Sequence, residues 1–422
     1  MDKYFQETRY ELQQISFGFL GGRYAGDGIM YWKPEDGFTI EARVDRHGPP
    51  PPGAIELRSL SVPKDADYSI IRMRLSTGAW AMTRVYLNRL FSLHSKWFSV
   101  PSARMIFYQP NPWEKPSDFR HGSALYAGSD KISLPYMLER EVRLQDEILE
   151  KRYDRKGIVH ATEAGLRLLG KVSDDSKTVS FHWRLPKSEW NRTENWRWAT
   201  ATKDALGILS QQTVELLMCE VAFGPRIRID MRQFRKGHDL DICAPFRDDF
   251  VDAERLAALA SFLGKGGEKA EICRRIIWQL SSAAQQKTWE SKELLVGTIL
   301  ESVLRTLYSI SYKKSFQIEQ CLDQFRQEYL TDLWIPWCSK ALVARKLLRQ
   351  RNAHQEWISC AGGSHSHEEM VKSIDAIILL SHFCGQMILA LAGFQNLEPR
   401  FPLPHEQWRP MSTYHRAPKD DA

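Results

Sequence analysis

A basic segment near residue 350 holds the side chains best suited to catalysis. It reads Arg345-Lys346-Leu347-Leu348-Arg349-Gln350-Arg351-Asn352-Ala353-His354. Arginine is a permanent planar cation that can hold phosphate oxygens, and histidine can take up and release a proton near neutral pH. Metal-free cleavage of RNA needs both kinds of group, because the 2′-hydroxyl requires a base, the leaving oxygen requires an acid and the phosphate requires positive charge.

Helical spacing relates these side chains to one another. Arg351 and His354 are three residues apart and would share one face of a helix, with Asn352 beside them. Arg349 precedes His354 by five residues, so it joins them only where the helix ends or bends near Asn352. Either arginine therefore fits the catalytic position, and a solvated basic helix face with one incidental histidine is the alternative explanation.

A second segment combines aromatic rings with cations. It contains Phe181-His182-Trp183-Arg184, followed by Trp190, Arg192, Trp196, Arg197 and Trp198. Rings interleaved with arginines can stack unpaired bases and hold phosphates, so Trp196 and Trp198 are candidate RNA contacts. Packing of these tryptophans within a sheet is the alternative.

The sequence indicates no metal or nucleotide site. His365 and His367 lie close together but have no defined third ligand. Glu368 and Glu369 fit the first turn of a helix, where the helix dipole favours acids. The segment 264–267 lacks the spacing of a phosphate-binding loop. We therefore assign no metal and no cofactor.

The elements that position these residues begin with predicted strands. Asp36-Gly37 between 29–32 and 38–44 predicts a hairpin, because glycine accepts the positive φ of a tight turn. A proline run at 48–53 predicts an extended connector. Leucine and isoleucine at helical spacing predict a helix within 134–155. Short segments rich in β-branched and aromatic residues predict further strands at 54–62, 68–75, 79–87, 104–108, 178–185, 214–223 and 227–231.

Beyond residue 252 the apolar residues recur with the period of helices. This pattern predicts helices at 252–263, 268–286, 291–310, 316–330, 336–357 and 368–394. The stretch 376–394 is about long enough to span a membrane. Because Ser381, His382 and Gln386 interrupt it, we interpret it as a buried core helix and expect no membrane association.

Composition bounds the class of protein. Of 422 residues, 43% are hydrophobic and 26% are charged, which argues against a disordered, collagenous or low-complexity chain. The net charge of +6 is compatible with an anionic partner. Seven cysteines without a Cys-x-x-Cys pair indicate reduced thiols, and the first residues lack a signal peptide, so we expect a cytoplasmic protein.

These patterns predict an α+β protein. A β-rich domain is expected at 1–245, an all-α helical bundle at 246–396 and a flexible tail at 397–422. The tail contains five prolines and a charged end and has little to bury.

The segment Arg349-x4-His354, with Asn352 inside it, resembles the Arg-x(4 to 6)-His motif of the HEPN superfamily. It lies between the last two long helices, as in that superfamily. The succession of a β-rich domain and a helical domain is similar to the ApeA type of bacterial antiphage defence protein. In many members Arg-Asn is followed by three residues and then His, whereas here Ala353 alone follows Asn352, so the motif arginine is Arg349 or Arg351.

The resemblance implies a metal-independent endoribonuclease, a toxin of antiviral defence that cleaves tRNA or other cellular RNA. His354 would be the general acid or base, Arg349 and Arg351 would hold the scissile phosphate, and Asn352 would fix the local geometry. Arg345 and Lys346 are expected to contact the RNA.

The family's active site is usually composite, so the resemblance also implies a homodimer. Glu301 could orient a motif side chain, although an ordinary exposed helix carboxylate is the alternative. The N-terminal domain, including its tryptophan-rich segment, would sense a phage-derived activator. Two other functions fit the sequence: a non-catalytic HEPN module that binds nucleotide or RNA or only dimerises, and a scaffold that binds protein.

Overall fold

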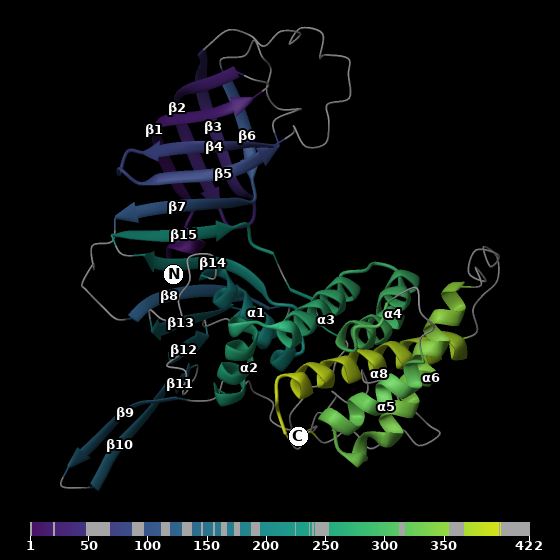
Figure 1. The fold of residues 1–422 in the computed structure, drawn as a ribbon. Coiled ribbons are helices and arrows are strands. Elements are labelled where there is room, and N and C mark those ends of the chain that lie inside the picture. The colour runs from purple at the N-terminus through teal and green to yellow at the C-terminus, as the bar shows by residue number, and fades with distance from the viewer. Residues whose placement is uncertain are drawn as a thin grey trace, which may run out of the picture.

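The structure is a computed structural model of the whole chain (Figure 1). It describes residues 2–19, 22–47, 68–86, 97–110, 119–128, 137–144, 147–154, 157–161, 167–172, 178–186, 195–223, 225–235, 237–238, 240, 253–311, 317–353, 367–395 and 397. The expected connector at 48–53, the expected strand at 54–62 and almost all of the expected tail lie outside these residues.

Strands fill most of the first 232 residues. They are β1 (Thr8–Phe19), β2 (Gly22–Lys33), β3 (Gly37–His47), β4 (Tyr68–Leu75), β5 (Trp80–Tyr86), β6 (Trp97–Ser102), β7 (Arg104–Pro110), β8 (Phe119–Ala127), β9 (Met137–Leu144), β10 (Glu147–Asp154), β11 (Gly157–Ala161), β12 (Arg167–Val172), β13 (Thr178–Pro186), β14 (Glu215–Phe223) and β15 (Arg226–Arg232). Apart from β9 and β10, they form one antiparallel sheet in the order β11-β12-β13-β8-β14-β15-β7-β5-β4-β1-β2-β3-β6.

The predicted hairpin around residue 37 is confirmed. β2 and β3 pair antiparallel from Lys33 opposite Gly37 to Arg23 opposite His47. Gly37 adopts φ +83°, a conformation that side chains with a Cβ rarely accept. The strand predicted at 68–75 coincides with β4.

The N-terminal strands curl around a core of their own. The edge strand β6 returns to β5, where the hydroxyls of Thr83 and Ser102 form a hydrogen bond of 2.6 Å. A 3-10 helix at Asp2–Phe5 closes one end: the hydroxyl of Tyr4 donates to the carbonyl of Arg232, and the indole of Trp32 donates to the carbonyl of Tyr4. The strands β1 to β7, with β15 and parts of β8 and β14, thus enclose one apolar core.

The rest of the sheet shares a second core with the helices. The helices are α1 (Asn195–Ser210), α2 (Ala253–Lys265), α3 (Glu268–Ala284), α4 (Trp289–Leu307), α5 (Ile318–Tyr329), α6 (Ile335–Ala353) and α8 (His367–Leu391). One buried cluster runs from β8, β13 and β14 through α1 into the helical bundle. The α+β class is thus confirmed, while apolar packing continues across residue 245, the expected domain boundary.

Two segments differ from expectation. The region predicted to be helical at 134–155 instead forms the hairpin of β9 and β10. Residues four apart share a face in a strand as they do in a helix, so the apolar spacing fitted both. The helix α1 was not predicted and carries Trp196 and Trp198, which therefore do not belong to a strand.

The apolar helix α8 is a core element. Its segment Val371–Leu391 is long and apolar enough to cross a membrane, yet 89% of that window is buried inside the protein. It contacts α3, α4 and α6. The interpretation of this stretch as a buried helix is confirmed.

Candidate functional site

The helices α4 and α6 lie close together at a glycine. A Cβ added at Gly297 would lie 3.2 Å from the Cβ of Leu348 and 3.7 Å from the backbone nitrogen of Arg349. A larger residue would separate the helices at this level. Glu301 lies one turn further along α4, on the same face, and is therefore brought against α6.

Glu301 binds three arginines from two helices. Arg305, one turn along α4, donates from its Nε at 3.0 Å. Arg345 and Arg349, one turn apart on α6, both donate to the other carboxylate oxygen. Glu301 is therefore not an ordinary exposed helix carboxylate but the centre of an ion-pair cluster. We call Glu301, Arg305, Arg345 and Arg349 the glutamate–arginine cluster.

The arginines dominate the electrostatics of this cluster. Burial by itself would raise the pKa of Glu301, but hydrogen bonds from Arg345 and Arg305 and the charge of Arg349 hold the pKa of that carboxyl below its usual value. Glu301 is thus ionised at neutral pH. Within this cluster three arginines surround one carboxylate, and guanidinium groups are suited to binding an anionic ligand such as a phosphate.

The four side chains differ in their access to solvent. The side chain of Arg349 is 52% exposed, whereas those of Arg345, Glu301 and Arg305 are only 14%, 15% and 9% exposed. Arg349 can therefore reach a ligand while Glu301 holds it in place. Arg345 is a largely buried partner of Glu301 and helps to position the carboxylate, and its expected contact with RNA stays a prediction.

The other motif residues follow along α6. Lys346 is exposed, three residues before Arg349 on the same helix. Arg351 and Asn352 continue α6 beyond Arg349. Their side chains and the whole of His354 lie outside the described residues, so their geometry stays a prediction.

A buried carboxylate extends the same stripe of α4. Glu293, Gly297 and Glu301 are spaced by four residues, and Glu293 is buried. Gly297 lies at the level of Leu348 and Glu301 at the level of Arg345, so the two helices run antiparallel. Glu293 lies one turn before Gly297 on α4, so we expect it at the level of the backbone of Asn352 on α6. Sequence reasoning missed Glu293 and Arg305, although their spacing from Glu301 could have indicated them.

The tryptophan segment does not form a stacking surface at Trp198. Its indole is 4% exposed and lies against Gly264 of α2. A buried ring cannot stack on a base, so the expectation that Trp198 contacts RNA is wrong. The side chain of Trp196 lies outside the described residues.

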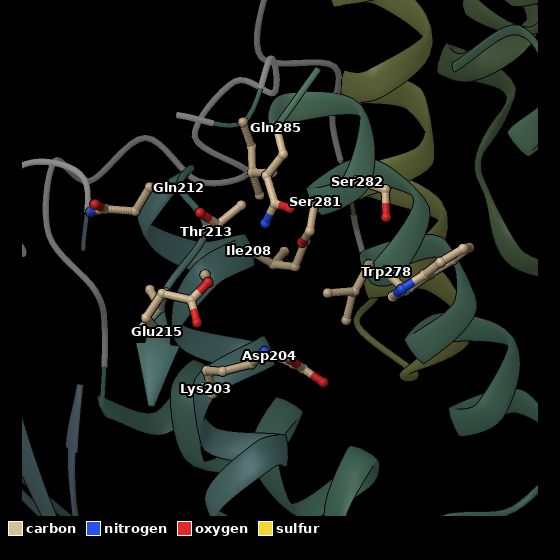
Figure 2. Close-up of a pocket in the computed structure, with 14 residues that line it drawn as sticks. Lys203, Asp204, Ile208, Gln212, Thr213, Glu215, Trp278, Ser281, Ser282 and Gln285 are labelled. Carbon is tan, nitrogen blue, oxygen red and sulfur yellow. Dashed lines mark ion pairs between the residues drawn. The ribbon is translucent and has the colours of Figure 1, made fainter. Parts of the chain in front are cut away.

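A separate polar pocket of about 170 Å³ lies between α1, the start of β14 and the end of α3. Figure 2 shows Thr213, Ser281 and Gln285 together at one end, while the ring of Trp278 points away from them. Burial raises the pKa of Asp204 in its wall, against the opposing effect of the charge of Lys203, whose Nζ lies 3.4 Å away. Of the candidate motif, the described side chains of Arg345, Lys346 and Arg349 do not line this pocket.

Among the described residues, no three His, Cys, Asp or Glu side chains gather as ligands for a metal ion. Comparison with known proteins found no matching protein-family model, curated protein or solved structure.

Proposed function

We propose that the chain is a metal-independent endoribonuclease of bacterial antiphage defence, with its active site at the C-terminal end of α6. The observation that supports this proposal is the ion pair between Glu301 and Arg349, the arginine of the Arg-x4-His motif. A carboxylate with a side chain only 15% exposed holds this half-exposed guanidinium group at the surface of the bundle. A merely solvated basic face would not need such an anchor.

The proposed reaction is transfer of a phosphodiester to the neighbouring 2′-oxygen. His354 removes the proton from the 2′-hydroxyl, the 2′-oxygen attacks phosphorus, and the bond to the 5′-oxygen breaks as an acid protonates it. The products are a 2′,3′-cyclic phosphate and a 5′-hydroxyl. Arg349, with Arg351, neutralises the phosphate oxygens as charge builds on them, and Asn352 orients the neighbouring groups.

One histidine cannot be base and acid in the same step. A homodimer of HEPN-like bundles supplies a second His354 and a second Arg349, so that each copy takes one role. In this proposal the substrate is tRNA or another cellular RNA in the cytoplasm. The β-rich part of the chain would respond to a phage-derived activator.

Cleavage of total cellular RNA in excess EDTA tests the proposal. Wild-type protein should generate cyclic phosphate ends, whereas His354→Ala and Arg349→Ala should not, with dimer and fold unchanged. Arg275→Ala removes an exposed arginine of α3 outside the cluster and should cleave normally. If the wild type leaves RNA intact, the assay is repeated with lysate from phage-infected cells.

Two results would reject the nuclease. Cleavage that persists in His354→Ala would show that another group does the chemistry. RNA that stays intact with infected lysate, but binds the wild type and not Arg349→Ala, would identify a non-catalytic RNA-binding module.

A further inference from the structure

Four neighbouring strands present a row of cations and rings on their outer face. The strands β4, β5, β7 and β15 are consecutive in the sheet (Figure 1). Their registers place Arg74 opposite Trp80, Trp80 opposite Tyr108, and Tyr108 opposite Arg228. Directly opposed residues share one face of a sheet, so these four side chains form a line across it.

This face is the outer one. On β4 the inward residues Ile71 and Met73 are buried in the N-terminal core, and the alternate residues Arg72 and Arg74 point the other way. Arg74 is exposed, and the indole of Trp80 is 45% exposed. Two aromatic side chains stand on adjacent strands, whose backbones lie about 5 Å apart, with an arginine at each end of the row. Together they form a surface suited to planar, anionic ligands.

The arginines continue above and below this row. Arg72 on β4 and Arg84 on β5 are exposed on the same face, as is Arg226 at the start of β15. Arg104 of β7 and Arg232 of β15 complete the set. The outer face of these four strands thus carries seven arginines in all.

Among the described residues of these four strands, one carboxylate lies on this face, and arginines already bind it. Asp230 of β15 is buried, and Arg104 donates to it from its Nε at 2.9 Å. The Nε of Arg232 lies 3.6 Å from the other oxygen of Asp230. The side chain of Arg104 is nevertheless 49% exposed. The described residues of these four strands thus place seven arginines and one carboxylate on this face.

The remainder of the outer surface is different. On β1 and β3 the exposed positions mix acids with bases, as with Arg9 and Glu11, or Glu41 and Arg43. The described helices contact β8, β11 and β14 rather than β4, β5 or β7. The arginine–aromatic face is thus distinct in charge, and the described helices pack mainly against other strands of the sheet.

We propose that the outer face of β4, β5, β7 and β15 binds single-stranded nucleic acid. The rings of Trp80 and Tyr108 stack on unpaired bases, and the surrounding arginines bind the phosphates. A duplex would present its phosphates but would keep its bases from the rings. An acidic protein segment would pair with the arginines and leave the rings without a planar partner. This site lies on the sheet and does not depend on the nuclease activity of the helical bundle.

Fluorescence anisotropy with a short 2′-O-methyl RNA tests this binding without cleavage, because the 2′-oxygen cannot attack. The double variant Arg72→Ala/Arg74→Ala should bind at least about 10-fold more weakly, with a salt dependence shallower by roughly 1.4 in log–log slope for two lost phosphate contacts. Trp80→Ala should weaken binding by about 10-fold, and Trp80→Phe should restore most of the loss.

Matched control variants distinguish binding at this face from non-specific attraction to the positive charge of the protein. Arg9→Ala/Arg43→Ala removes two exposed arginines of β1 and β3, and Trp289→Ala removes an indole of similar exposure, 43%, on α4. Both should bind like the wild type. The proposal would be overturned if the β4 and β5 variants bound RNA as tightly as the wild type, or if the control variants lost as much affinity as they do. Competition by polyglutamate as strong as that by the oligonucleotide would also overturn it.

The same assay identifies which type of nucleic acid binds. Unmodified single-stranded DNA of equal sequence should bind with similar affinity if bases and phosphates alone are read. Much weaker binding of DNA would identify RNA as the ligand, whereas preference for duplex over either single strand would contradict stacking on Trp80.

Discussion

Replacement of Glu301 by alanine should lower the free energy of unfolding by about 3–5 kcal/mol, because it leaves buried guanidinium groups without their counter-charge. The side chains of Arg305 and Arg345 are 9% and 14% exposed, so water cannot readily replace the lost carboxylate. By contrast, Arg349→Ala should cost only about 0.5–1 kcal/mol, since that side chain is half exposed and its ion pair is screened by solvent.

Chemical denaturation followed by circular dichroism measures both values. A double-mutant cycle between residues 301 and 345 should give a larger coupling energy than a cycle between 301 and 349. The reasoning is refuted if Glu301→Ala has wild-type stability, or if Arg349→Ala costs as much as Glu301→Ala. Loss of RNA cleavage in Arg349→Ala with nearly unchanged stability would separate its role in catalysis from a role in folding.

The pH dependence of stability in a second variant, Glu301→Gln, tests the same ion pairs. The folded-state pKa of Glu301 lies below its usual value, so its contribution to stability is present above the unfolded-state pKa and is lost as the pH falls through the folded-state pKa. The melting temperatures of wild type and Glu301→Gln should therefore differ most near neutral pH and converge below about pH 4. A difference that stays constant into acid would contradict this account.

Three further substitutions test the packing around the sites. Gly297→Leu should destabilise the chain by about 1–3 kcal/mol, because a Cβ at this position would lie only 3.2 Å from the Cβ of Leu348 and the rest of the side chain would not fit. An unchanged thermal melt would show that the two helices can move apart without cost. Trp198→Ala should cost about 3–5 kcal/mol in a denaturant titration because its indole is buried, and a loss below about 1 kcal/mol would place it at the surface. Asp204→Asn should gain stability relative to the wild type as the pH rises above about 4, since burial raises the pKa of that carboxyl against the effect of Lys203; melting curves across this range check the sign, and a gain that shrinks with rising pH would contradict it.

Local pattern was enough to locate most helices of the C-terminal half. The predicted helices at 268–286 and 316–330 correspond to Glu268–Ala284 and Ile318–Tyr329. These helices each have one buried and one exposed face, so apolar residues recur in their sequences about every 3.6 residues. The helix Asn195–Ser210 lacks such a signal, because residues all round it, such as Ala199, Ala201 and Leu206, are buried.

Residue types also predicted the candidate chemistry, but not its arrangement. The sequence shows arginines at 345 and 349 and a carboxylate at 301, separated by more than forty residues. The exposed-carboxylate explanation of Glu301 was as consistent with the sequence as an orienting role. Only the close crossing of α4 and α6 at Gly297 brings the three charges within hydrogen-bonding distance.

The sequence by itself determined the α+β class, the hairpin at Gly37, the buried nature of α8 and the basic segment that ends at His354. These properties depend on neighbours a few residues away, through turn geometry and the period of burial. The tertiary structure alone decided that Glu301 anchors Arg349, that Trp198 is core, and that Trp80 and Tyr108 lie side by side among arginines. These relations depend on strand register and helix crossing, which join residues far apart in the chain and leave no local trace in the sequence.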